Sequence, residues 1–192
     1  MRRFFIAINL PPEVKDKLVK LQKALSQYIP NVRWVTADNL HLTLVFLGAI
    51  NDLERKKVGQ ITQEVLKETE PFSLQVKGLG VFPEPKRVRI LWAGVFGNFA
   101  LKLLNRLLFR KLTQAGFRVD EREFTAHITL GRTKAKANRE IVSFLLDKYK
   151  EVRFGAFEVF SVEIMESQLQ RSGPIYRVVE KIELKRFKNL DL

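Results

Sequence analysis

The chain has 192 residues, of which 46% are hydrophobic and 29% charged, a balance typical of a folded protein and not of a disordered one. Its 34 basic and 21 acidic residues leave a formal net charge of +13, which attracts phosphates and makes nucleic acid the expected partner class. Cysteine is absent, which excludes a thiol nucleophile, a disulfide framework and cysteine-ligated metal sites.

The amino-terminal segment carries two arginines followed by the apolar run of residues 4–8, an order that also opens signal peptides. The run ends at Asn9 and Pro11-Pro12, and it is shorter than the apolar core of about 7–15 residues that a signal peptide needs. No apolar stretch approaches the roughly 18 residues of a membrane span. We therefore predict a first strand at residues 3–9 and a soluble protein that contacts no membrane. The absence of cysteine fits a cytoplasmic location, and nothing in the sequence suggests more than a monomer.

The elements that follow are predicted from apolar periodicity and from turn residues. In the first half of the chain the pattern predicts a helix that opens at Pro12 and closes at Tyr28-Ile29-Pro30, a short extended segment at 32–35, a strand at 41–47 that Gly48 ends, a charged amphipathic helix at 52–69, and a hairpin of strands 72–82 and 87–96.

In the second half the pattern predicts a helix at 100–115, a strand at 124–130, a short helix at 138–149, and final strands in the runs 152–166 and 175–185, separated by a polar loop at 167–174. This order predicts an α+β fold in which each half carries a sheet, helices and one motif strand. No Gly/Ser-rich linker interrupts the chain, so residues 1–192 are expected to form one domain. Its halves are roughly 1–96 and 97–192, and the first and last strands can share a lobe.

A four-residue pattern occurs twice: His41-Leu42-Thr43-Leu44 and His127-Ile128-Thr129-Leu130. These two copies contain both histidines of the chain. Side chains alternate along a strand, so each copy presents its His and Thr on one face and its aliphatic residues on the other. A single histidine on a strand is most often structural, but two copies that repeat the threonine as well favour a functional pair. Two imidazoles can supply one base and one acid to a single reaction.

With these motifs the sequence resembles the two-histidine (2H) phosphoesterases, which carry tandem His-x-Thr-x motifs. It is most similar to their RNA 2′,3′-cyclic phosphodiesterase branch, once described as 2′-5′ RNA ligases. The resemblance spans most of the chain and includes five further segments: Phe4-Phe5-Ile6-Ala7-Ile8, Arg33-Trp34, Leu91-Trp92-Ala93-Gly94-Val95, Ser167-x-Leu169 and Gly173-Pro174-x-Tyr176.

The resemblance implies two pseudo-symmetric lobes, each an antiparallel sheet with helices on its outer face, and an active-site cleft between the sheets. It implies metal-independent hydrolysis of RNA 2′,3′-cyclic phosphate ends to 2′-phosphomonoesters. It also implies a phosphate-binding arginine at Arg132, His127 as the general base and His41 as the general acid.

The residues themselves permit this chemistry. Opening a cyclic phosphate needs a base for water, an acid for the departing ribose oxygen, and donors for the phosphate charge. Thr43 and Thr129 can donate to the nonbridging oxygens, and the guanidinium of Arg132 can bind the phosphate. Simple alternation points Arg132 away from His127 unless Gly131 ends or bulges the strand. No arginine follows the first motif at residues 46–48.

Four further residues are candidates for substrate contacts. Trp34 can stack on a base and Arg33 can contact a phosphate, while core packing is the alternative for Trp34. Arg171 and Tyr176 lie in or near the polar loop. Two histidines cannot furnish a closed zinc site, and no acidic cluster adjoins either motif, so neither a metal nor another cofactor is expected.

Three alternative functions remain open at this point. Because the same groups can run the reverse reaction, a 2′-5′ RNA ligase is one alternative, and a nucleotide 2′,5′-phosphodiesterase is another. A noncatalytic module that binds RNA ends is the alternative of a different class. Such a module has no need of a neutral and a protonated imidazole held together.

Overall fold

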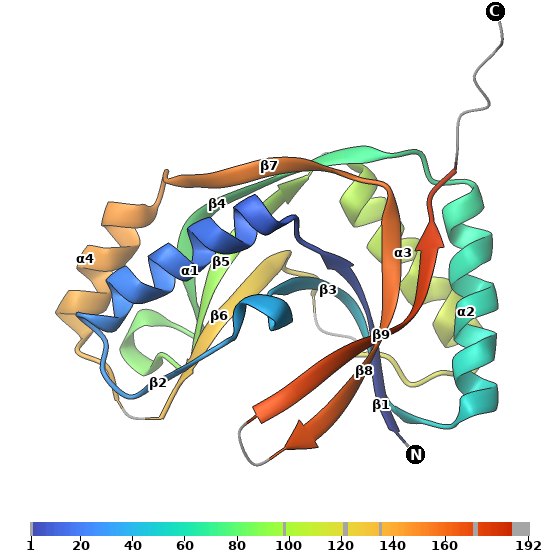
Figure 1. The fold of residues 1–192 in the computed structure, drawn as a ribbon, viewed down its shortest axis with the longest axis horizontal. Coiled ribbons are helices and arrows are strands. Elements are labelled where there is room, and N and C mark those ends of the chain that lie inside the picture. The colour runs from blue at the N-terminus through green and yellow to red at the C-terminus, as the bar shows by residue number, and fades with distance from the viewer. Residues whose placement is uncertain (1, 98, 121–122, 135, 171–172, 186–192) are drawn as a thin grey trace, which may run out of the picture.

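The computed structural model describes residues 2–97, 99–120, 123–134, 136–170 and 173–185 (Figure 1). The described strands are β1 (Arg2–Asn9), β2 (Val32–Trp34), β3 (His41–Ile50), β4 (Phe72–Phe82), β5 (Ile90–Gly97), β6 (His127–Thr133), β7 (Arg153–Val159), β8 (Ser161–Gln170) and β9 (Gly173–Glu183). The described helices are α1 (Pro12–Ser26), α2 (Asp52–Lys67), α3 (Phe99–Gln114) and α4 (Arg139–Tyr149), with single 3₁₀ turns η1 (Ala37–Asn39) and η2 (Pro85–Arg87). None of the described helices has the length and apolar character needed to cross a membrane.

Local sequence signals explain where the helices begin. Pro12 occupies the first turn of α1, where its missing N–H costs no hydrogen bond. Helix α2 opens with a reciprocal capping box: Glu54 N–H donates to the side chain of Asn51, and Asn51 N–H donates to the carboxylate of Glu54. The side chain of Asn138 accepts hydrogen bonds from the first turn of α4. These caps fix the helices at the ends of the strands that precede them.

The described strands form one antiparallel sheet in the order β7-β4-β5-β6-β3-β1-β8-β9, with β2 paired to β6. Its two halves meet where β3 pairs with β6, at Leu42 and Ile128. Helices α1 and α4 pack on the half that contains β4 to β7, and α2 and α3 pack beside β3 and β9. Figure 1 shows this division, with α1 and α4 on the left and α2 and α3 on the right. The α+β prediction is confirmed, and the two half-sheets are parts of one curled sheet.

Each half-sheet contains strands from both halves of the sequence. Strands β1 and β3 join β8 and β9 on one side, and β2, β4 and β5 join β6 and β7 on the other. Helix α1, although it follows β1, packs on β7 and β6 across the molecule.

The two faces of the sheet differ in composition. The main hydrophobic core lies between the sheet and the helices and includes Leu42 and Ile128, both without exposed surface. A second, small cluster of Phe5, Ala7 and Met165 lies apart from this core. Along β1 these residues alternate with those of the main core, so they belong to the opposite face of the sheet. We call this opposite face, which also carries the two histidines, the histidine face.

Two predicted elements near the carboxyl terminus were wrong in detail. The run 152–166 is not one strand, because the chain leaves its pairing with β4 at Val159 and begins a new pairing with β1 after the exposed Phe160. The segment 167–174 is not a loop throughout, because Ser167 still pairs with Tyr176 in the β8–β9 hairpin. Backbone pairing does not require apolar side chains, so the polar composition of 167–174 gave no sign that β8 and β9 extend into this segment.

Candidate active site

The two histidines begin neighbouring strands that meet at the centre of the sheet. Leu42 and Ile128 are opposed across β3 and β6, and both point into the main core. Since side chains alternate along a strand, each histidine and the threonine two residues after it point to the other face. The structure thus brings both His-x-Thr pairs to one place, related by the local twofold axis of the antiparallel pair.

Each imidazole is oriented by the backbone two residues before it. The Nδ1 of His41 lies 2.7 Å from the carbonyl oxygen of Asn39, and the Nδ1 of His127 lies 2.7 Å from that of Thr125. A carbonyl can only accept, so Nδ1–H is the donor in both rings and Nε2 is left to exchange protons. The hydroxyl of Thr43 donates to Nε2 of His41 at 2.9 Å.

Both histidines have lowered pKa values in the free protein. Burial lowers the pKa of His41 from 6.5 to about 4, because the charged imidazolium loses its hydration. The hydrogen bond to Asn39 opposes this shift, while the nearby charges of Lys15 and His127 add to it. Burial also lowers the pKa of His127, and the charge of Arg132 contributes. Both imidazoles are therefore neutral at pH 7 before substrate binds.

Aromatic side chains hold each ring in place. Phe5 stacks on His41 with ring centroids 4.9 Å apart, and Tyr176 meets the same imidazole edge-on at 5.1 Å. On the other side, Phe82 meets His127 edge-on at 5.0 Å, and the ring of Trp92 lies 6.1 Å away. Of these four aromatic residues, sequence analysis proposed only Tyr176. Phe5 and Trp92 lie in segments that carry the family resemblance, but neither was proposed for the site, and Phe82 had no such signal. Their strands join the motif strands only in the folded sheet.

The arginine after the second motif reaches the histidine face through a β-bulge in β6. Thr129 pairs with Trp92, and Gly131 pairs with the preceding residue of β5, so Leu130 is an extra residue on β6. This insertion shifts the alternation by one position. Arg132, which an unbroken strand would turn toward the core, therefore shares a face with Thr129.

The charge of Arg132 agrees with this placement, because it lowers the pKa of His127 and opposes the rise that burial produces in the pKa of Tyr176. Gly131 is needed beside the bulge, since a Cβ there would lie 2.6 Å from Val32 and 2.8 Å from Trp34. The glycine thus lets β2 pack closely against the bulged strand.

The first motif strand contains the same bulge at the equivalent position. Thr43 pairs with Ala7, and Val45 pairs with the preceding residue of β1, so Leu44 is the extra residue. Phe46 therefore stands on the histidine face where the second strand has its arginine. Its side chain is 53% exposed, and its ring lies 6.2 Å from that of Phe5. The two halves of the site are geometrically alike but chemically different: one presents a cation and the other an aromatic ring.

The remaining candidate residues are placed as follows. Arg33 pairs in register with Arg132 across β2 and β6, so their side chains share a face, and the Arg33 guanidinium lies against Gly173 of the β8–β9 hairpin. The pKa of Tyr176 responds to both arginines. Trp34 pairs with Gly131 and packs against the main core. Arg171 lies outside the described residues.

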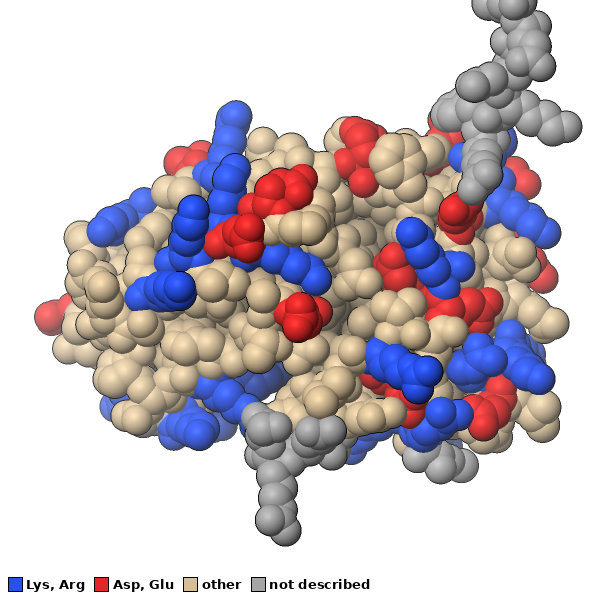
Figure 2. All heavy atoms as spheres, in the orientation of Figure 1, with Lys and Arg blue, Asp and Glu red and all other residues tan. Residues whose placement is uncertain are grey.

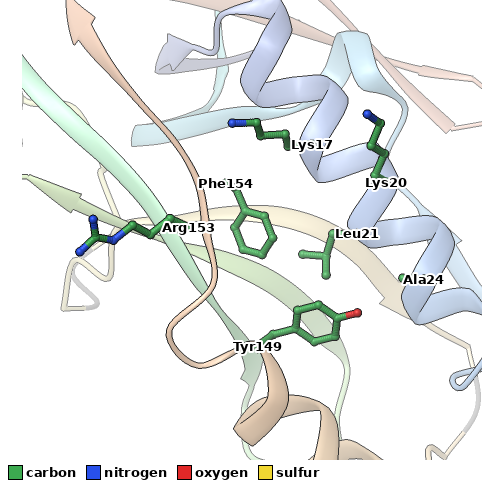
Figure 3. Close-up of a pocket in the computed structure, with 7 residues that line it drawn as sticks. All are labelled: Lys17, Lys20, Leu21, Ala24, Tyr149, Arg153 and Phe154. Carbon is green, nitrogen blue, oxygen red and sulfur yellow. The ribbon is translucent and has the colours of Figure 1, made fainter.

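Two surface cavities lie away from the histidines. One, of about 300 Å³, opens between α1 and β7 and is lined by Lys17, Lys20, Leu21, Ala24, Tyr149, Arg153 and Phe154 (Figure 3). The other adjoins the start of α4 and is lined by Lys86, Lys136, Ala137, Asn138, Arg139, Glu140 and Ser143. Neither contains a predicted site residue. Figure 2 shows Lys and Arg side chains interspersed with acidic ones, so on this face the basic excess forms no single patch.

The described part of the chain contains no group of three or more His, Asp or Glu side chains placed to hold a metal ion. The chemical groups that the histidine face does offer include two neutral imidazoles, the hydroxyls of Thr43 and Thr129, and the guanidiniums of Arg132 and Arg33. This set suits proton transfer around an anionic phosphate.

Residues 3–184 match the family described as the AKAP7 2′5′ RNA ligase-like domain, and the chain belongs to that family. Among curated relatives, the RNA 2′,3′-cyclic phosphodiesterase of Methanothermobacter thermautotrophicus is 32% identical over 182 residues, which cover 95% of this chain and 98% of the relative. The protein of the same name from Aquifex aeolicus is 35% identical over 184 residues, covering 95% and 97%.

Solved structures show the same fold. The protein TT0787 of Thermus thermophilus has a TM-score of 0.81 and 28% identity, with 95% of this chain and 98% of that chain covered. E. coli LigT, solved in complex with 3′-AMP, has a TM-score of 0.76 and 24% identity, covering 96% and 99%. The second likeness concerns the fold alone.

Proposed function

We propose that this protein is a metal-independent RNA 2′,3′-cyclic phosphodiesterase that produces 2′-phosphomonoester ends. The observation that carries the proposal is the pair of His-x-Thr motifs on one face, each with its Nδ1–H held by a backbone carbonyl, so that Nε2 is the nitrogen that can exchange a proton with substrate. The curated relatives bear the name of this activity over nearly the full length of the chain. The 2′ regiochemistry is part of the proposal and follows the family.

In the proposed reaction, water attacks the phosphorus opposite the 3′-oxygen. The bond from phosphorus to the new oxygen forms as the bond to the 3′-oxygen breaks, the base takes a proton from water, and the acid gives one to the 3′-oxygen. Thr129 and Arg132 donate hydrogen bonds to the nonbridging oxygens, whose charge is shared in the transition state. Thr43 can do the same once Nε2 of His41 is protonated, because its hydroxyl then no longer donates to that nitrogen. The products are a 2′-phosphate and a free 3′-hydroxyl.

We assign His127 as the base and His41 as the acid. This assignment requires that His41 gain a proton before it acts, because with a pKa of about 4 it is neutral at pH 7 and has no proton on Nε2 to donate. The bound phosphodiester anion can raise the pKa of His41, because a negative charge beside an imidazole stabilises its protonated form. Protonation of His41 is thus coupled to substrate binding.

This coupling predicts two different pH optima. The profile of kcat/KM reports the free enzyme, where both histidine pKa values are lowered, so its optimum should lie below pH 6.5. The profile of kcat reports the complex, where the anion raises both pKa values, so its optimum should lie at higher pH. Steady-state rates measured from pH 4 to 9 check this, and coincident optima would contradict the coupling.

The two roles can be separated with a phosphodiester whose aryl leaving group needs no protonation. His41→Ala should then recover much of its lost rate, while His127→Ala should remain slow. The reverse pattern would exchange the two roles and leave the two-histidine mechanism in place.

The assignment also orients the substrate. If His41 protonates the 3′-oxygen, the ribose and base lie in the half that carries β3. There the exposed ring of Phe46 offers a surface on which a base can stack. Arg33, beside Arg132, can bind the phosphodiester that leads to the rest of the RNA chain. We further propose that residues 1–192 act as one bilobal domain and as a cytoplasmic monomer.

A direct assay tests the function. The purified protein is incubated with a nucleoside 2′,3′-cyclic phosphate and excess chelator, and the products are resolved by chromatography against 2′- and 3′-phosphate standards. We expect complete conversion to the 2′-phosphate, with the His41→Ala/His127→Ala double variant as the inactive control. Activity that disappears in chelator and returns with a divalent ion would contradict the metal-free mechanism.

The same assay separates the alternatives. An RNA-end-binding module would bind the cyclic phosphate without opening it. A 2′,5′-phosphodiesterase would prefer a 2′-5′-linked dinucleotide to the cyclic phosphate. A ligase would join a cyclic-phosphate end to a 5′-hydroxyl end faster than water opens the ring.

A further inference from the structure

A buried amide on α1 binds the bulge of the second motif strand. Gln22 lies between Leu21 and Leu25 on the apolar side of the helix and is only 6% exposed. Its side-chain N–H groups donate to the carbonyl oxygens of Leu130 and Val35, each at 2.8 Å. Leu130 is the bulged residue of β6, and Val35 follows β2. Strands β2 and β6, which carry Arg33 and Arg132, are already paired, and the N–H of Val35 donates to the carbonyl of Leu130 at 2.9 Å. Gln22 adds two hydrogen bonds from the helix at the end of this pairing.

The first motif strand is held in the same way from a different helix. Asn105 lies on α3 beside the buried Leu104, and its side-chain N–H donates to the carbonyl oxygen of Leu44 at 2.8 Å. Leu44 is the bulged residue of β3. In both halves of the site, therefore, a side-chain amide from a helix donates to the carbonyl of the bulged residue. This shared feature lies outside the His-x-Thr repeat.

We propose that Gln22 and Asn105 are positioning residues, which hold the two bulges in register and thereby keep Arg132 and Phe46 on the histidine face. This inference rests on the proposed function, which assigns phosphate binding to Arg132 and base stacking to Phe46. Neither amide faces the substrate, so each acts only through the strand above it.

Gln22 contributes to stability as well, because an aliphatic side chain would leave the carbonyl oxygens of Leu130 and Val35 without these donors. Stability and positioning therefore need separate readouts. What the amide provides is a fixed geometry. A bulge has one residue more than its partner strand, and a slip of one residue would turn Arg132 toward the core.

The test is a double-mutant cycle read by binding of inorganic phosphate in calorimetry and by kcat/KM for a cyclic nucleotide. Gln22→Met keeps the length of the side chain and removes both donors. It should weaken phosphate binding and lower kcat/KM by about 10- to 100-fold, since misplacement by about 1 Å costs as much as 10²-fold. In an Arg132→Ala background, Gln22→Met should have almost no further effect, because the group that it positions is already absent.

Matched controls separate positioning from loss of stability. Gln63→Met makes the same substitution at an exposed site of α2 and should change neither readout. Asn105→Leu should couple to Phe46→Ala and be additive with Arg132→Ala. Equal losses from Gln22→Met in the wild-type and Arg132→Ala backgrounds would overturn the proposal.

If Gln22→Met does not fold, Gln22→Leu removes both donors with a shorter side chain that suits the helix and its buried surroundings, and it should show the same coupling. Failure of both variants to fold would assign Gln22 to stability and also overturn the proposal. Because phosphate binding does not require turnover, coupling without ring opening would reject the proposed function and retain the positioning role.

Discussion

His127→Ala and His41→Ala should each lower kcat for ring opening by about 10²- to 10⁴-fold, the usual contribution of a general acid or base. Each ring lies at the surface of the sheet and not in the main core, so its removal should leave the fold intact. The two losses should not add in the double variant, because proton donation and proton removal serve one transition state. Single-turnover rates with a cyclic nucleotide measure these effects.

The threonine variants are the matched controls for this result. Thr43→Ala and Thr129→Ala each remove one hydrogen bond to a charged group, a loss of about 1.5–3 kcal/mol. They should therefore reduce the rate less than the histidine variants do, with the same circular dichroism spectrum. If either His→Ala variant retains most of the wild-type activity, the two-histidine mechanism is wrong.

Arg132→Ala should lower kcat/KM by about 10²- to 10³-fold, the effect of deleting one donor to the developing charge of a transition state. Arg132→Lys should restore little, because the ammonium cannot reproduce the paired N–H groups of the guanidinium. The effect depends on the bulge that turns this side chain onto the histidine face.

Arg177→Ala is the control for net charge. Arg177 is exposed and follows Tyr176 on β9, so it points away from the histidine face, yet its loss changes the net charge by the same amount. It should leave kcat and KM within a factor of about two, a difference of less than 0.5 kcal/mol. Unchanged constants for Arg132→Ala would make Arg132 a surface cation.

The sequence was sufficient to predict the order of most elements and the faces of the motif strands. The alternation His-aliphatic-Thr-aliphatic is a local property, and it places His41 and Thr43 on one face whatever strands lie beside them. The long-range pairing was beyond reach: nothing in residues 152–166 says that the chain pairs first with β4 and then with β1.

The positions of Arg132 and Phe46 were predictable only in part, because they too depend on long-range strand pairing. Gly131 indicated that β6 could bulge, but a bulge is defined by the register of two strands, and register is settled in the folded sheet. The matching bulge at Leu44 has no glycine beside it and gave no signal. Gln22 and Asn105 were visible only as polar residues among apolar helix positions, a pattern that many surface helices share.

The position of β1 has a consequence for synthesis of the protein. Strand β1 can pair with β3 as soon as residue 50 is made, but its other edge pairs with β8, and the N–H of Asn9 donates to Glu163, 154 residues later. At the speed of a ribosome this edge stays open for on the order of ten seconds. Tyr176, which packs on His41, arrives later still. Nascent chains should therefore be inactive until Tyr176 has been made, and the open apolar edge of β1 is where a chaperone would bind them.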